Sequence, residues 1–284
     1  MGQSFYEADA DARAVFDEAS ELLGYDMKAL CFEENEKLNL TQYTQPAMVT
    51  TGIAIMKVVE KQGLLPDTAA GLSLGEYEAL YAAGALSVTD AIRVVARRGE
   101  LMEAAVPAGV GAMAAVLGAE ASLIEETLSE IPEVWIANYN CPGQIVISGK
   151  KEAVEAAAEA LKARGIKRVL MLNVSGPFHS GLLREVGEEL GKVLAETEIH
   201  PLRIPYYANV TGGIVEDAAK VRGLLTEQVY SSVRFEQSIR NMLSAGVDTF
   251  YELGPGKTLA GFVKKIDREA TVVNIETMED LAKI

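Results

Sequence analysis

A serine placed between two glycines is the feature of this sequence with the clearest chemical meaning. Ser73 stands midway between Gly71 and Gly75, after a short apolar run and before a helical pattern that continues through Tyr77 and Leu80. This G-x-S-x-G spacing is typical of a nucleophile elbow, a sharp strand-to-helix turn that needs small residues around the serine. The N–H groups that open the following helix would stabilise an oxyanion. The pattern predicts Ser73 as a nucleophile; a tight structural turn is the alternative that five residues leave open.

Two histidines compete for the role of proton acceptor, which a serine nucleophile needs. His179 lies in the stretch Gly-Pro-Phe-His-Ser, an expected turn between a strand and a helix, where active-site groups of α/β proteins gather. His200 lies between a helix and a strand, and we expect it in a surface loop. A lone histidine in a turn usually has no catalytic role. His179 is predicted as the base because Ser73 needs one.

An arginine on an apolar helix face is the third candidate. In the helix expected over residues 88–105, Arg98 is in register with Val94 and Leu101, whereas its neighbour Arg97 faces a charged side. A guanidinium on an apolar stripe must extend outward to water, pair within the protein or meet an anion. The sequence alone leaves these alternatives even. In a serine acyl-transfer site, a buried arginine indicates a two-pronged grip on a substrate carboxylate.

Alternating helices and strands have to position these residues, which predicts an α/β fold with a mostly parallel sheet. A helical stripe that stops at Gly24 opens the chain, and Pro46 is expected to start a second helix. Residues 110–174 have their own order of strand, helix, two strands, helix and strand, typical of a ferredoxin-like unit. We therefore predict a large domain of residues 1–109 and 175–284 with an inserted subdomain of residues 110–174.

The overall charge excludes some partners. The chain of 284 residues has a formal net charge of −15, which argues against binding nucleic acid or an anionic membrane. No apolar stretch is long enough to span a bilayer, and no signal-peptide pattern is present at the N-terminus. The two cysteines, Cys31 and Cys141, have neither metal-ligand spacing nor a disulfide framework. We expect a cytoplasmic protein.

Taken together, these residues resemble the malonyl-CoA:acyl carrier protein transacylases and the acyltransferase domains of fatty acid and polyketide synthases. The matching stretches occur in the family's order and cover almost the whole chain. They are Thr44-Gln-Pro-Ala47, Gly71-Leu-Ser-Leu-Gly-Glu76, Arg98-Gly99 with Met102, Gly111-Ala-Met113, Asn138-Tyr-Asn-Cys-Pro-Gly-Gln144, Gly176-Pro-Phe-His179, Asn209-Val-Thr-Gly212 and Glu252-Leu-Gly-Pro-Gly-Lys257. The resemblance implies an α/β-hydrolase-like catalytic domain with a ferredoxin-like insert.

The resemblance also implies a role for each matched position. Ser73 would be the nucleophile, His179 the base and Arg98 the anchor of the malonyl carboxylate. The backbone N–H of Leu74 would be one oxyanion donor, and Gln45 would line the pocket.

Three further positions complete the implied site. Met102 would contact the substrate. Phe178 resembles the malonyl-selective version of the family, since its ring would crowd an α-methyl branch. A main-chain carbonyl orients the histidine in this family, and the matching position in this chain is Arg234.

The chain departs from the family pattern in two places. Leu72 stands where the family has a histidine, which alters the pocket wall. The family also begins with a strand and a Gly-Gln-Gly loop that supplies the other oxyanion donor, whereas this chain begins at the following helix. We expect this strand and donor to be absent, at a cost of about 3 kcal/mol in transition-state stabilisation and with an opened sheet edge.

The implied reaction is a ping-pong transfer of malonyl from malonyl-CoA to the phosphopantetheine thiol of acyl carrier protein by a monomer that needs no cofactor. Carrier proteins are usually acidic, so docking requires a local basic patch, either near residues 162–168 or near residues 257–265. Two rivals remain. A serine esterase or thioesterase would share the elbow and the histidine but would have no need of Arg98. A catalytically impaired homologue that acts as a scaffold would transfer nothing.

Overall fold

Helices form most of the first hundred residues in the computed structural model, which describes residues 1–107, 109–174 and 176–284. They are α1 (Gln3–Ala8), α2 (Ala10–Leu23), α3 (Met27–Phe32), the short turn η1 (Lys37–Asn39), α4 (Thr41–Lys61), α5 (Gly75–Ala82) and α6 (Val88–Ala104). The predicted stop at Gly24 is confirmed, because this residue caps α2 in the left-handed conformation. The prediction that Pro46 starts a helix is wrong. α4 begins at Thr41, whose N–H is bound by the Glu103 carboxylate at 2.7 Å.

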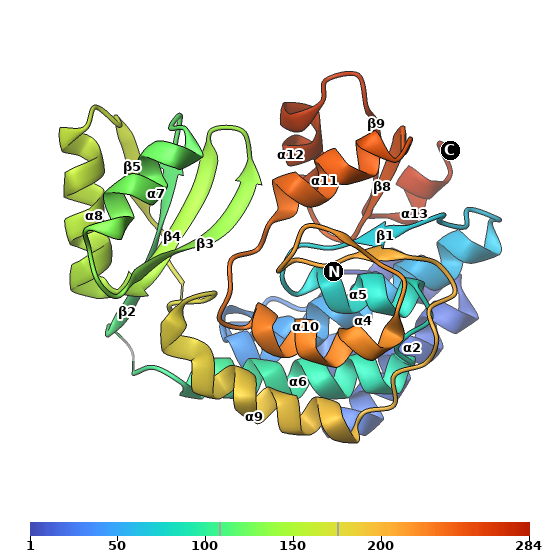
Figure 1. Ribbon diagram of the computed structural model, residues 1–284. Coiled ribbons are helices and arrows are strands. Elements are labelled where there is room, and N and C mark those ends of the chain that lie inside the picture. The colour runs from blue at the N-terminus through green and yellow to red at the C-terminus, as the bar shows by residue number, and fades with distance from the viewer. Residues whose placement is uncertain (108, 175) are drawn as a thin grey trace.

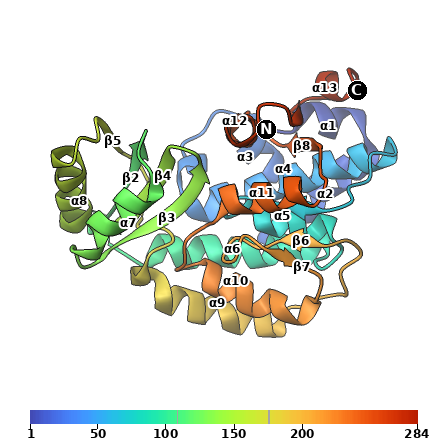
Figure 2. The same cartoon turned by 45° about the horizontal axis from the view of Figure 1, so that its top comes forward.

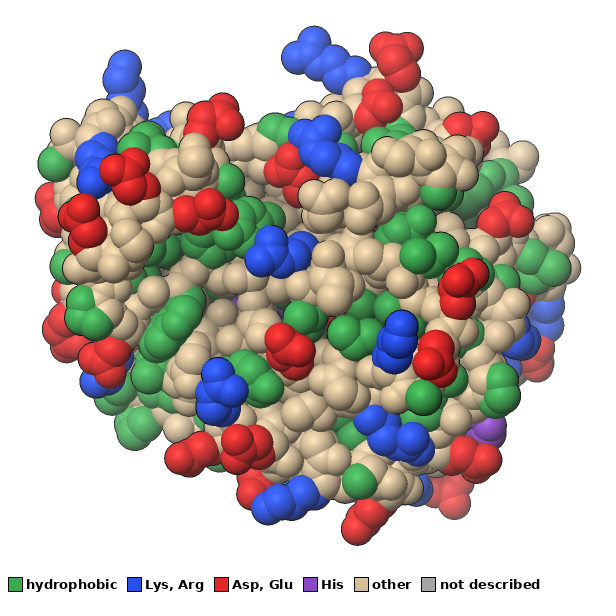
Figure 3. All heavy atoms as spheres, viewed as in Figure 1, with side chains coloured by type: hydrophobic (Ala, Val, Ile, Leu, Met, Phe, Trp, Pro, Cys, Tyr) green, Lys and Arg blue, Asp and Glu red, His purple; other side chains and the backbone are tan. Residues whose placement is uncertain are grey.

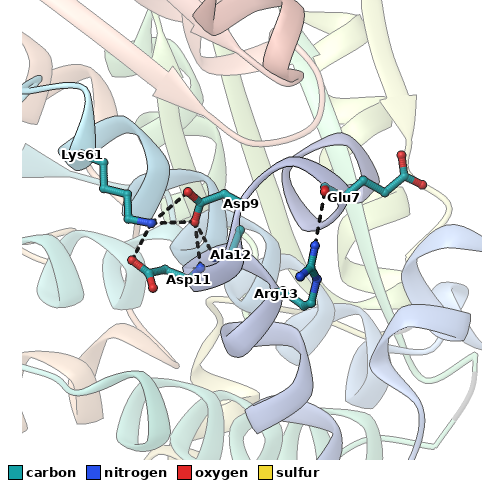
Figure 4. Close-up of polar contacts among 6 residues, drawn as sticks. All are labelled: Glu7, Asp9, Asp11, Ala12, Arg13 and Lys61. Atoms are coloured by element: carbon teal, nitrogen blue, oxygen red, sulfur yellow. Dashed lines mark hydrogen bonds and ion pairs between the residues drawn. The ribbon is translucent and has the colours of Figure 1, made fainter.

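The start of α2 is tied to the end of α4 by a lysine (Figure 4). Asp9 caps α2, since its Oδ1 accepts hydrogen bonds from the backbone N–H groups of Asp11 and Ala12 at 2.8 and 3.2 Å. The Lys61 Nζ lies 2.8 Å from Asp9 Oδ2 and 2.7 Å from Asp11 Oδ2. The hydrogen bond from Lys61 holds the pKa of Asp9 below its ordinary value. This network therefore adds a surface contact between two helices that also pack against each other.

The strands of the large domain form two small sheets. In the first, β1 (Ala69–Ala70) pairs in parallel with β6 (Tyr206–Tyr207), and β6 pairs antiparallel with β7 (Ile214–Val215). In the second, β8 (Thr249–Leu253) and β9 (Thr271–Ile275) are parallel. The helices that accompany these strands are α9 (Arg184–Glu196), α10 (Val221–Gln228), α11 (Phe235–Ser244), α12 (Thr258–Ile266) and α13 (Met278–Leu281), with the short turns η2 (Gly181–Leu183) and η3 (Ala218–Lys220). The mixed α/β class predicted from the sequence is confirmed.

Packing between helices forms the main core. α4 is buried on nearly every side, and α6 and α2 pack against it. α9 and α10 lie side by side in both views of the ribbon (Figures 1 and 2), and α9 also packs against α6. Within the described residues, no helix is both long enough and apolar enough to cross a membrane.

The middle of the chain folds as a separate lobe, which lies beside the large domain in Figure 1. Its elements are β2 (Gly111–Leu117), α7 (Ala121–Ser129), β3 (Val134–Cys141), β4 (Gln144–Lys150), α8 (Lys151–Ala163) and β5 (Arg168–Met171). The strands form one antiparallel sheet in the order β3-β4-β2-β5, as in ferredoxin-like folds. The core under α7 and α8 draws on this lobe alone, with Ile124, Ile147 and Leu161 fully buried. The domain boundaries stay a prediction, and position 175 lies outside the described residues.

One backbone bridge joins the two lobes. Val233 donates its N–H to the Ala137 carbonyl at 2.8 Å and accepts a hydrogen bond from the Tyr139 N–H at 2.8 Å. Val233 belongs to the segment that follows α10, and both partners belong to β3. Figure 3 shows the hollow between the lobes on this face, with acidic and basic side chains interspersed around it.

Candidate active site

The candidate nucleophile lies on a strained turn between β1 and α5. Ser73 has a φ of 52°, in the left-handed region that residues other than glycine rarely adopt. A Cβ atom at Gly71 would lie 2.0 Å from the carbonyl carbon of Gly75, so no side chain fits there. The Asn209 side chain holds both ends of the turn, because Oδ1 accepts from the Ser73 N–H at 2.6 Å and Nδ2 donates to the Gly71 carbonyl at 2.6 Å. The requirement for glycine at position 71, two residues before the serine, is therefore steric.

The candidate base lies within hydrogen-bond distance of the serine. His179 is 3% exposed, and its Nε2 lies 2.7 Å from Ser73 Oγ. Its Nδ1 lies 2.8 Å from the main-chain carbonyl oxygen of Gln228. A carbonyl can only accept, so Nδ1 carries the proton and the Nε2 lone pair faces the serine hydroxyl. This is the tautomer that a general base requires.

The carbonyl that orients the histidine is not the predicted one. The resemblance implies Arg234, but the Arg234 carbonyl accepts from the Ser238 N–H at 3.0 Å, at the start of α11. The Arg234 guanidinium lies 5.3 Å from the centre of the Tyr139 ring, in the other lobe. Gln228 takes the orienting role because it is the last residue of α10, where carbonyls have no partner within the helix.

Arg98 lies beside the same serine and is buried, with 1% exposure. Its Nη1 donates to Gln45 Oε1 at 2.8 Å, and its Nη2 donates to Ser73 Oγ and to Gln228 Oε1 at 3.1 Å each. Gln45 Nε2 lies 3.4 Å from the sulfur of buried Met102. The alternative of an arginine extending to water is thereby excluded. Two neutral amides and the serine hydroxyl hold the guanidinium beside the reacting atom.

The remaining predicted positions lie around this centre. Leu74 follows the serine and caps α5, so its N–H belongs to the end of a helix where donors lack helical partners. Phe178 is partly buried and packs against Met113, Ala137 and Val146 on the ferredoxin-like sheet. It also packs against the main core of the large domain, so its ring lies between the two lobes. The oxyanion role of Leu74 and the selectivity of Phe178 stay predictions.

Burial sets the electrostatics of the site. Loss of solvation, together with the nearby Arg98 charge, lowers the pKa of His179 to about 4. The imidazole is therefore neutral at pH 7 and able to take a proton. Burial also lowers the pKa of Arg98, although a guanidinium stays charged at neutral pH. Burial raises the pKa of Glu76, behind the serine on α5, to about 7.

Two residues of the site escaped the sequence prediction of roles. Gln228 binds His179 through its carbonyl and Arg98 through its side chain, and the end of an amphipathic helix was its only signal. Glu76 is fully buried and accepts hydrogen bonds from Gln228 Nε2 at 2.7 Å and from the Asn209 N–H at 3.3 Å. Its position in the first turn of α5, three residues after the nucleophile, was its signal.

The geometry is that of an acyl-transfer site, with a hydroxyl, a neutral imidazole and a buried cation around one position. The chain matches the acyl transferase domain family over residues 1–280 and belongs to that family. It is an acyltransferase. The resemblance seen in the sequence is thereby confirmed.

Similar proteins narrow the family further. The chain is 46% identical over 286 residues to the malonyl CoA-acyl carrier protein transacylase of Bacillus subtilis (strain 168), a match that covers 99% of this chain and 90% of that protein. The crystal structure of malonyl CoA-acyl carrier protein transacylase from Clostridium perfringens is 42% identical, with a TM-score of 0.96 over 100% of this chain and 90% of that one. A type II PKS acyl-carrier protein in complex with its malonyl-transacylase is also similar, with 38% identity, a TM-score of 0.96 and coverage of 100% and 93%.

Proposed function

We propose that this acyltransferase moves a malonyl group from malonyl-CoA to the phosphopantetheine thiol of an acyl carrier protein through an ester on Ser73. The observation that carries the proposal is a buried guanidinium 3.1 Å from the nucleophilic oxygen. A simple acyl group has no charge for it to meet, whereas malonyl has a carboxylate. The names of the relatives and the solved complex with a carrier protein support the same substrate and acceptor.

The first half-reaction follows from the distances. His179 Nε2 takes the proton of Ser73 Oγ as the oxygen attacks the thioester carbonyl. The Gln228 carbonyl holds the Nδ1 proton of the imidazolium that forms. The carbon–sulfur bond then breaks, the thiol of coenzyme A leaves with the proton from His179, and malonyl stays on the serine as an ester.

The second half-reaction reverses these roles. The carrier thiol gives its proton to His179 and attacks the ester, and Ser73 leaves with that proton. Arg98 holds the malonyl carboxylate in both halves, in place of its contact with the serine hydroxyl. The reaction involves no cofactor, and the coenzyme A thioester is a substrate.

Of the two basic stretches, we favour residues 257–265 for docking an acidic carrier. In the other stretch, two of the four basic side chains, those of Lys162 and Arg164, are already paired with Glu159 and Glu126. In the favoured stretch, Lys264 Nζ donates to a backbone carbonyl and Lys265 Nζ to the Gln144 amide, so no carboxylate neutralises either in the described part of the chain. We further propose that the protein acts as a cytoplasmic monomer.

Labelled malonyl-CoA tests the proposal, with holo-acyl carrier protein as acceptor. We expect label on the carrier, with an intermediate malonyl-enzyme visible by intact mass and absent in Ser73→Ala. Release of free malonate without carrier labelling would support the thioesterase alternative. The absence of any label on enzyme or carrier would support a scaffold. A malonylated Ser73→Ala protein would refute the assignment of the nucleophile.

A further inference from the structure

Among the described residues, no carboxylate forms a hydrogen bond or ion pair with the buried arginine of the site. Arg98 is 1% exposed, and its three hydrogen-bond acceptors are two amide oxygens and a hydroxyl. An isolated ion in a protein interior costs several kcal/mol, so a buried charge is normally balanced. A negative charge that balances Arg98 must therefore act through an intervening group.

Glu76 is the acid in the right place. It is 0% exposed, and its Oε2 accepts from the Gln228 side-chain amide at 2.7 Å. The oxygen of the same amide accepts from Arg98 at 3.1 Å. A single glutamine therefore connects the carboxylate with the guanidinium, donating to one and accepting from the other.

The orientation of that amide is fixed by three partners. Gln228 Nε2 donates to both Glu76 Oε2 and the Ser73 carbonyl, the latter at 2.8 Å, and Oε1 faces Arg98. A flipped amide would place its oxygen against two acceptors and its N–H groups against a cation. A dipole aligned between opposite charges strengthens both hydrogen bonds.

We propose that Glu76 is the counter-ion of Arg98 in the free enzyme and takes up a proton when the malonyl carboxylate binds Arg98. The inference rests on the proposed function, because malonyl supplies the second negative charge. One guanidinium then faces two carboxylates in a buried site, and the carboxylate linked only through Gln228 is the one that becomes neutral. Glu76 Oε1 is buried without a hydrogen-bond partner among the described residues, so it can accept the proton without breaking a bond.

The groups around Glu76 leave it as the one that titrates near neutrality. Arg98 faces it from α6, Tyr77 from its own helix and Tyr206 from β6. Burial raises the pKa of both tyrosines, so they are neutral at pH 7. His179, which shares Gln228 with Glu76, is neutral as well. The pKa of Glu76, raised by burial to about 7, leaves about half of the free enzyme ionised there at pH 7.

Proton uptake during malonyl-enzyme formation tests the inference. Ester formation is itself proton-neutral at pH 7, since the hydroxyl proton ends on the thiol of coenzyme A. In weakly buffered solution with a pH indicator, mixing enzyme with malonyl-CoA at pH 7 should remove about half a proton per site from solution. Glu76→Gln should remove none, because its amide oxygen can still accept from Gln228 but cannot titrate.

Glu78→Gln is the matched control. Glu78 lies two residues along α5, burial raises its pKa to about 8, and it lines a groove together with residues of β1 and β8. This variant should keep the uptake of about half a proton. A second measurement is the equilibrium constant for malonyl-enzyme formation, which should fall about tenfold from pH 6 to pH 8 in the unmodified enzyme and stay flat in Glu76→Gln.

Intact mass, read in the same samples, separates the two proposals. Malonyl-enzyme that forms without proton uptake, or uptake that persists in Glu76→Gln, would overturn the counter-ion inference and leave the acyl transfer intact. An unmodified enzyme that forms no malonyl-enzyme would overturn the proposed function, and the inference with it. If Glu76→Gln fails to fold, a pH-independent equilibrium constant in the unmodified enzyme would still refute the inference.

Discussion

Removal of the Arg98 guanidinium should separate malonyl from acetyl substrates. In the free enzyme Nη1 and Nη2 donate to three acceptors, and a bound carboxylate can take two such donors at once. A hydrogen bond to a charged group contributes about 1.5–3 kcal/mol, so two contribute about 3–6 kcal/mol. Arg98→Ala should therefore lower kcat/KM for malonyl-CoA by about 10²- to 10⁴-fold.

The assay compares two acyl donors on one enzyme. Acetyl-CoA has no carboxylate, so its kcat/KM should change by only a few-fold, or rise because no cation has to be buried beside a methyl group. Rates of acyl-enzyme formation are followed by intact mass, and a circular dichroism melt shows that the variant is folded. Because the Arg98 charge helps to lower the pKa of His179, the pKa of this base should also move upward in the variant.

Equal losses with both donors would refute the reasoning. They would mean that Arg98 acts through the serine hydroxyl or the fold, and not through the substrate carboxylate. Lys in place of Arg is the graded variant, since it keeps the charge but loses the planar fork. We expect Arg98→Lys to fall between Ala and the unmodified enzyme with malonyl-CoA.

Three more predictions follow from named contacts. Below pH 6, where Glu76 is already protonated, the kcat/KM for malonyl-CoA should stay level as pH falls and decline only near the lowered His179 pKa of about 4, because the neutral imidazole is the active form; a decline on the acid side centred near pH 6.5 in a pH–rate profile would contradict the burial of the base. Gly71→Ala should abolish malonyl-enzyme formation, because its Cβ would lie 2.0 Å from backbone, whereas Gly75→Ala meets nothing within 4 Å and should stay active in the same mass assay. Asp9→Ala should cost about 1 kcal/mol of unfolding free energy through the lost helix cap, and Lys61→Met less than that; urea denaturation that ranked them the other way would place the stability in the ion pair.

The sequence predicted local features of the site wherever a residue spacing is compatible with a single local structure. Gly71 and Ser73 predicted the elbow because only glycine fits the turn before the serine. The stripe through Val94 placed Arg98 on an apolar helix face, since helical periodicity fixes the face on which a residue lies, but it left open whether the guanidinium is buried or extends to water. The order of elements over residues 110–174 predicted the ferredoxin-like sheet, whose strand order the structure has.

Contacts between residues far apart in the chain could not be predicted from the sequence. The predicted Arg234 carbonyl and the observed Gln228 carbonyl are six residues apart, and only the path of the chain after α10 decides which of them meets His179. Pro46 predicted a helix start, but the helix begins five residues earlier, at Thr41, where a carboxylate on α6 accepts a hydrogen bond from the N–H. The link from Glu76 to Arg98 spans three separate segments of the chain, and no local pattern encodes it.

The backbone bridge at Val233 links the position of the ferredoxin-like lobe to the orientation of the catalytic base. Val233 forms backbone hydrogen bonds with two residues of β3. Only four residues, a short tether, separate it from Gln228, whose carbonyl orients the imidazole of His179. A rotation of the lobe would pull on this short tether and turn the ring away from the serine. A hybrid in which this lobe is exchanged between acyltransferases must therefore keep the backbone hydrogen bonds between β3 and Val233. Without them, we expect the hybrid to fold with the imidazole turned away from the serine.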